Sequence, residues 1–293
     1  MEDLWNEVTE KDFFESCLKN FSSPEQIFYI TDSGEYLAYW PKNYSGEKKT
    51  LQSRNSLIGS YTEKFTADIF KSLLRTNKLF VIQGAICEQI GLTSKSPADV
   101  AICTVNKKIL EPDEIKLLIE VKMSIVWNWQ YFPQKLSDNL ICIGDYMSHQ
   151  GNPGLLRSDS MLKAIGKSIN IRVSGNSASK IPILVLGNTP IANSYYDKVD
   201  HLCKSGVIQG FYSLNPTPII DDNRNIKSTK ELGFIRIDSI DELNGLIENL
   251  LNKDNEYFSS MINKQELGRI IELANKKPTY EEKVEEFLKL IRK

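Results

Sequence analysis

The chain is poor in the residues that most often carry metal and redox chemistry. Among its 293 residues are two histidines, His149 and His201, and five cysteines. Two histidines exclude the three-histidine zinc site of many hydrolases. The cysteines are odd in number and never form a Cys-x-x-Cys pair, which argues against a disulfide framework and a thiolate zinc site. We therefore expect any catalytic metal to be held by carboxylates.

Long apolar runs and an excess of one charge are also missing. The longest apolar candidate, residues 181–187, contains a proline and is far shorter than the ~20 residues of a membrane-spanning helix. The acidic N-terminus has no apolar signal core. These features predict a cytoplasmic protein without a membrane partner. With 36 basic and 38 acidic residues the net charge is −2, so a polyanion would have to bind a local basic patch.

The hydrophobic content of 41% and the charged content of 25% are typical of a globular chain with a sizeable core. Turn and linker signals divide it into three regions. Residues 1–50 are expected to form an N-terminal appendage, a helix followed by a hairpin. Residues 51–214 are expected to form the core, and residues 215–293 a mainly helical region that contains two capping-box matches.

Periodicity predicts the elements of the core. Helix 158–171 is expected to bury Met161, Leu162, Ile165 and Ile169. Run 181–187 is apolar throughout, as in a buried central strand. The predicted order is helix 55–75, strands 79–86, 99–105 and 116–121, helix 158–171, strand 181–187, helix 195–204 and strand 207–214. This order belongs to the α/β class, with a mixed central sheet that includes a meander.

The residues best suited to chemistry lie on two of these strands. Asp99 begins one strand, while Glu120 and Lys122 end the next, where side-chain alternation places both on one face. If Asp99 lies opposite them, two carboxylates converge, as a Mg²⁺ site requires. The metal would polarise a scissile phosphate, and Lys122 would orient or deprotonate the attacking water. Glu63 extends the apolar row of Ala67 and is a further candidate.

Asp99, followed after twenty-one residues by Glu120-Val121-Lys122 within this order of elements, resembles the PD-(D/E)XK nuclease superfamily, and within it the type II restriction endonucleases. Pro97-Ala98-Asp99 stands where the superfamily has Pro-Asp. The resemblance covers about residues 55–214. It implies a restriction-endonuclease-like core and Mg²⁺-dependent hydrolysis of double-stranded DNA at a specific site by a homodimer. Glu63 matches a further acid that members often carry on the preceding helix.

A second group of residues is suited to DNA contacts. Glycines and a proline in loop 149–154 allow close backbone approach, and the helix that follows offers free N–H groups to phosphate. The candidate DNA-binding residues are His149, Asn152, Arg157, Lys163 and Lys167. An ordinary turn followed by a solvated helix face explains the same pattern. The aromatic run from Trp127 to Phe132 fits a core or a dimer surface better than a base-stacking platform.

Two other functions are compatible with the same residues. A repair, junction-resolving or RNA-directed nuclease would use the same active site on another substrate. A non-catalytic DNA-binding protein would use Asp99, Glu120 and Lys122 only as surface salt bridges. Binding of Mg²⁺ or Mn²⁺ distinguishes the last reading from the others.

Overall fold

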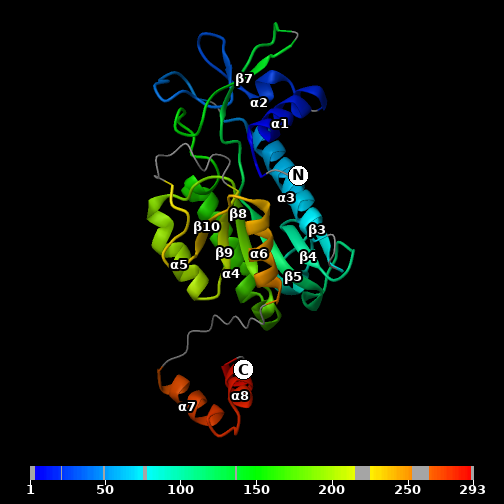
Figure 1. Ribbon diagram of the computed structural model, residues 1–293, viewed down its shortest axis with the longest axis vertical. Coiled ribbons are helices and arrows are strands. Elements are labelled where there is room, and N and C mark those ends of the chain that lie inside the picture. Colours follow the sequence, from blue (N-terminus) through cyan, green and yellow to red (C-terminus); the bar gives the residue numbers. More distant parts are fainter. Residues whose placement is uncertain are drawn as a thin grey trace.

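A mixed six-stranded sheet lies at the centre of the computed structural model, which describes residues 4–20, 22–48, 50–74, 78–135, 137–214, 225–252 and 264–291 (Figure 1). The sheet order is β10-β9-β8-β5-β4-β3. Its strands are β3 (Phe80–Ala85), β4 (Ala98–Cys103), β5 (Ile115–Val121), β8 (Ile183–Gly187), β9 (Gly210–Ser213) and β10 (Phe234–Arg236). Strands β3, β4 and β5 form an antiparallel meander, and β5, β8, β9 and β10 run parallel. The predicted α/β class with a mixed sheet is confirmed.

Helices cover both faces of this sheet. The helices of the chain are α1 (Glu7–Asn20), α2 (Pro24–Ile27), α3 (Gln52–Leu73), α4 (Ser158–Val173), α5 (Tyr196–Lys204), α6 (Ile240–Asn252), α7 (Lys264–Ala274) and α8 (Tyr280–Ile291). Helices α3 and α6 share a core with Ile119 of β5, whereas α4 and α5 pack against the opposite face. Burial of apolar side chains on both faces explains the continuous apolar run of β8.

The N-terminal hairpin forms a second, smaller sheet with two later strands, in the order β1-β2-β6-β7. Its strands are β1 (Tyr29–Ile30), β2 (Tyr36–Leu37), β6 (Asn128–Tyr131) and β7 (Leu140–Gly144). Strands β1 and β2 form the predicted hairpin. Strands β6 and β7, which the sequence did not predict, lie between β5 and α4 and pair with the hairpin. Trp127 and Trp129 are buried in the core, as one of the two structural interpretations of the aromatic run predicts, and Tyr131 packs against that core.

The region after residue 214 contributes to the central sheet. Strand β10 pairs with β9, and the side chains of Leu243 and Ile247 on α6 are fully buried in the main core. Helices α7 and α8 pack against each other and contribute no residue to the three described apolar clusters. No helix among the described residues has the length and apolarity that a bilayer crossing demands.

The buried face of α4 differs from the predicted one. Met161 is buried as expected, but Leu162 is 62% exposed and Ile169 is 43% exposed. The face that packs against the sheet instead carries Ala164 and Ile171. The prediction failed because large apolar side chains were given more weight than the small Ala164, which permits close helix packing. This rotation of α4 matters for the site, because Lys167 lies between Ala164 and Ile171 in the sequence.

Candidate active site

Asp99 and Glu120 meet across the antiparallel pair of β4 and β5. Val100 is paired with Ile119, so the register places Asp99 opposite Glu120, as predicted. The backbone N–H of Val121 donates a hydrogen bond to Asp99 Oδ2 at 2.8 Å, which fixes the orientation of this carboxylate. Ile119 and Val121 point into the main core on the other face. Strand alternation thus separates the charged face from the apolar one.

Lys122 follows the last residue of β5 and reaches both carboxylates. Its Nζ lies 2.5 Å from Glu120 Oε1 and 3.8 Å from Asp99 Oδ2. It also donates to the carbonyl oxygen of Val121 at 3.1 Å. The Lys122 backbone is held because its N–H donates to the Leu186 carbonyl of β8 at 2.7 Å. The three predicted catalytic residues therefore form one cluster.

Asn188 immobilises the chain just after Lys122. This side chain is fully buried at the end of β8. Its Oδ1 accepts from the Ser124 N–H at 3.0 Å, and its Nδ2 donates to the Ser124 carbonyl at 2.7 Å. These two hydrogen bonds satisfy the backbone N–H and carbonyl of Ser124, where the chain leaves the sheet after β5. Asn188 thus acts as a positioning residue for the segment that carries Lys122.

Lys167 of α4 is a fourth member of the cluster. Its Nζ lies 2.8 Å from Asp99 Oδ1 and 2.6 Å from Glu120 Oε2. Two carboxylates and two ammonium groups thus lie together, each with at most a fifth of its side chain exposed. The sequence assigned Lys167 to the same DNA-facing surface as Lys163, but Lys163 is 70% exposed and pairs with Asp159. The two lysines do not share a surface.

Glu63 lies at the edge of the cluster, on α3. Its Oε2 accepts a hydrogen bond from Gln83 Nε2 of β3 at 3.2 Å. Burial raises the pKa of the Glu63 carboxyl, the Gln83 hydrogen bond lowers it, and the nearby charge of Asp99 raises it further. Gln83 pairs with Val100, the residue after Asp99, so its hydrogen bond places Glu63 near the charged cluster. Gln83 was not predicted, because a polar residue on a strand carries no local signal of its partner.

The ammonium group of Lys167 lies between the carboxylates of Asp99 and Glu120. Burial raises the pKa of Glu120, and the negative charge of Asp99 raises it further. The pKa of Lys167 is lowered by burial but raised overall by Glu120 and Asp99. Within the described residues, no three carboxylate, histidine or cysteine side chains come together as a metal-binding group. Carboxylate oxygens are nevertheless the donors that Mg²⁺ prefers, so Asp99 and Glu120 are the residues that would hold such an ion.

A cavity of about 520 Å³ opens beside Lys122. It is lined by the N-terminal hairpin, the first turns of α3, the end of β5 and the loop before α4. Asn152 and Arg157, both predicted as DNA contacts, line this cavity. It therefore connects the charged cluster to two predicted binding residues that lie far from it in the sequence.

His149 does not lie on a DNA-facing surface. The imidazole is 2% exposed and stacks on Tyr39 with ring centroids 3.9 Å apart. Its Nε2 hydrogen-bonds to the Val126 carbonyl at 3.1 Å, and its Nδ1 accepts from the Gly151 N–H at 3.1 Å. The prediction of a base or phosphate contact, or of surface residence, is thus corrected to a structural role. A single polar residue in a glycine-rich loop gave no sign of the stacking partner, which is distant in sequence.

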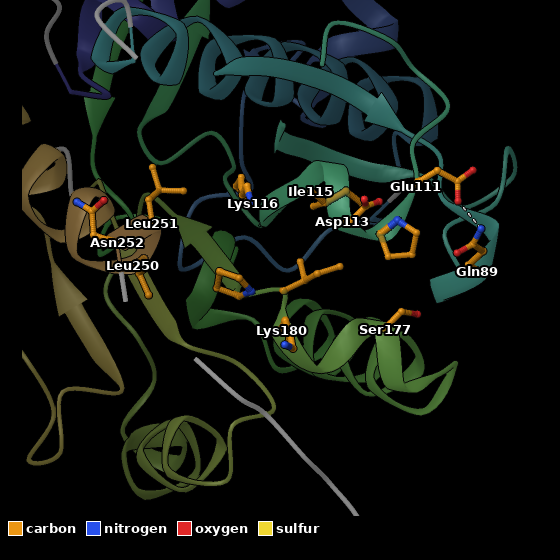
Figure 2. Close-up of a pocket in the computed structure, with 13 residues that line it drawn as sticks. Gln89, Glu111, Asp113, Ile115, Lys116, Ser177, Lys180, Leu250, Leu251 and Asn252 are labelled. Carbon is orange, nitrogen blue, oxygen red and sulfur yellow. Dashed lines mark hydrogen bonds between the residues drawn. The ribbon is translucent and has the colours of Figure 1, made fainter. Parts of the chain in front are cut away.

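A larger cavity lies at the end of strand β5 that carries Ile115 and Lys116, away from the charged cluster. Figure 2 shows the side chains that line it. The cavity has a volume of about 730 Å³ and is lined by side chains of both charges, with Lys116 and Lys180 beside Glu111 and Asp113. Gln89 donates a hydrogen bond to Glu111 at its rim. This cavity differs from the candidate active site in its mixture of charges and lies at the other end of β5.

Comparison of the chain with protein-family models, with curated proteins and with solved structures finds no match. The candidate active site therefore rests on the geometry of its own residues.

Proposed function

We propose that the chain is a Mg²⁺-dependent nuclease with a restriction-endonuclease-like core that hydrolyses phosphodiester bonds. More specifically, we propose a type II restriction endonuclease, a homodimer that cuts double-stranded DNA at a specific site. The observation that carries the proposal is the convergence of Asp99, Glu120 and Lys122 at the end of β5. The cationic cavity beside Lys122 and the order of elements around the mixed sheet support it.

Each residue has a role that follows from its charge and position. Asp99 and Glu120 would hold the metal, for which their carboxylate oxygens are suitable donors. Bound Mg²⁺ supplies charge neutralisation at the scissile phosphate and lowers the pKa of a water molecule. Lys122 lies between this cluster and the cavity, where its ammonium binds a phosphate oxygen and orients the attacking water. Val121 and Leu186 hold Asp99 and Lys122 in place through backbone hydrogen bonds.

The test is incubation of the purified chain with methylation-free plasmid DNA, in Mg²⁺ and in EDTA. We expect discrete Mg²⁺-dependent fragments from the wild type, and a loss of cleavage of about 10²-fold or more in Asp99→Ala and Lys122→Ala. Lys116→Ala is the matched control, because this exposed lysine lies at the other end of β5. Thermal melting establishes that each variant is folded. Cleavage that survives in both active-site variants would refute the assignment of the site.

One observation favours a second candidate, a non-catalytic DNA-binding protein. The two carboxylates and two lysines satisfy one another as a closed ion-pair cluster. A nuclease site must exchange the Lys167 contacts for metal, so Mn²⁺ should raise the melting temperature of the wild type and not that of Asp99→Ala. A melting temperature that ignores Mn²⁺ in both proteins would favour the ion-pair cluster. Cleavage of branched DNA or RNA, with duplex DNA left intact, would favour another nuclease of the same superfamily.

A further inference from the structure

The cavity beside Lys122 has a lining of unusual charge. Four of its side chains are cationic, namely Lys48, Arg54, Lys122 and Arg157. None of the described residues that line it is acidic. Lys122 is engaged with Glu120, and Arg157 lies 3.5 Å from Asp159, so the excess of positive charge is concentrated at the side formed by Lys48 and Arg54. Such a lining favours an anion.

Two helices begin at this cavity. The first turn of α3 contributes Arg54 and Asn55, and the start of α4 contributes Arg157 and Ser160. Neither helix has a side-chain hydrogen bond at its N-cap. The backbone N–H groups at these ends carry the positive pole of each helix and lack intrahelical acceptors. Their orientation adds to the attraction that the cationic side chains exert on an anion.

Arg54 supplies an independent observation. The residue is 2% exposed, and its guanidinium carbon lies over the rings of Tyr29 and Tyr39, at 5.2 Å and 4.8 Å from their centroids. Its Nη1 donates to the Ala38 carbonyl, whereas its Nε is buried without a hydrogen-bond partner. No ion pair of Arg54 with a carboxylate occurs in the described part of the chain. A buried charged donor that is left unsatisfied costs free energy, which a ligand would recover.

We propose that this cavity is a phosphate-binding subsite, in which Arg54 and Lys48 hold a phosphate group adjacent to the one that Lys122 engages. The planar guanidinium, fixed by two tyrosine rings and one carbonyl, is pre-organised to donate to phosphate oxygens. This inference rests on the proposed nuclease function, because that function places the scissile phosphate beside Lys122. The phosphate would belong to a nucleic-acid backbone or to a free nucleotide.

The salt dependence of duplex binding tests the subsite. Binding of a fluorescent duplex oligonucleotide is measured in EDTA, which prevents cleavage, at several salt concentrations. Each lost phosphate contact should reduce the slope of log K against log salt by about 0.9. We expect this reduction, and about tenfold weaker binding, in Arg54→Met and in Lys48→Gln. Lys116→Gln removes the same charge at the remote end of β5 and should leave the slope unchanged.

Lys48 is exposed, so Lys48→Gln keeps the test decisive if Arg54→Met fails to fold. Wild-type slopes in folded variants would overturn the subsite, unless phosphate or a mononucleotide stabilises the wild type and not these variants. Wild-type slopes together with such stabilisation would assign the cavity to a free nucleotide. Reduced slopes without any Mg²⁺-dependent cleavage would support the subsite while refuting the nuclease. Cleavage with wild-type slopes, and without stabilisation by phosphate, would refute the subsite alone.

Discussion

Three charged side chains of the candidate site come from the β4–β5 pair and the residue after it, whereas Lys167 and Arg54 come from helices. Asp99, Glu120 and Lys122 were found from sequence because strand alternation and meander pairing fix which side chains face one another. Lys167 comes from another element, and its partners depend on how α4 rotates against the sheet. Arg54 depends on a tyrosine in the hairpin and another in the segment that follows it. No local pattern in the sequence encodes those contacts.

His149 provides a prediction at the same scale. Burial lowers the pKa of its imidazole to about 4, from an ordinary value of 6.5. Protonation would also place a proton on Nδ1, which now accepts from the Gly151 N–H. The unfolded chain therefore binds the extra proton first as the pH falls. The contribution of His149 to the free energy of unfolding should be fully present above pH 6.5 and should decrease by about 3 kcal/mol as the pH falls to 4.

Urea unfolding between pH 4 and pH 7 measures this effect. His149→Gln should be less stable than the wild type at pH 7, and this difference should shrink by about 3 kcal/mol between pH 6.5 and pH 4. His201→Gln, at an exposed position on α5, should retain the wild-type pH dependence. A His149→Gln variant whose stability falls as steeply as that of the wild type would assign the pH dependence to other groups.

At the scale of elements, local sequence patterns predicted the helices and strands that pack against their neighbours in the chain. Helix α3 and the β3-β4-β5 meander were anticipated because their periodicity is long and regular. Strands β6 and β7 were missed because they are short and pair with a hairpin about ninety residues earlier. The contact between α1 and the segment after Lys122 was likewise invisible, since it depends on one buried carboxylate.

That carboxylate belongs to Glu10 and joins α1 to the start of β6. Its two oxygens accept from the Trp5 and Trp129 indoles and from the Val126 and Trp127 N–H groups, at 2.5 to 3.1 Å. Burial raises the pKa of Glu10 to about 8, although the four hydrogen bonds favour the carboxylate. Above this pKa the ionised carboxylate only accepts hydrogen bonds, so it satisfies all four donors, which a side-chain amide cannot do.

Glu10→Gln should therefore destabilise the chain by about 2 to 5 kcal/mol, because the amide NH₂ would face buried donors. Chemical denaturation at pH 9, where Glu10 is ionised, measures the change. Glu7→Gln, on the exposed side of the same helix, serves as the control and should remain within about 0.5 kcal/mol of the wild type. A Glu10→Gln protein as stable as the control would mean that the four hydrogen bonds do not hold α1 in place.

For the whole molecule, the question is where along the chain the folded core ends. The predicted boundary at residue 214 falls within the central sheet, because β10 pairs with β9 beyond it. Helix α6 covers the same face as α3 and buries Leu243 and Ile247 completely. Residues after Asn252 contribute nothing to the described apolar clusters. The amino-acid composition does not change at residue 214 or at residue 252 in a way that reveals where the core ends.

Two truncations test where the folded unit ends. A chain that stops at Asn252 loses α7 and α8 and should keep a melting temperature within about 3 °C of the full chain. A chain that stops at Leu214 loses β10 and α6, and the exposed apolar face of the sheet should leave it unfolded or aggregated, since removal of a single buried leucine or isoleucine side chain costs about 2 to 5 kcal/mol. Circular dichroism on both chains measures the difference. Cooperative unfolding of the shorter chain would show that the sheet is complete without its last strand.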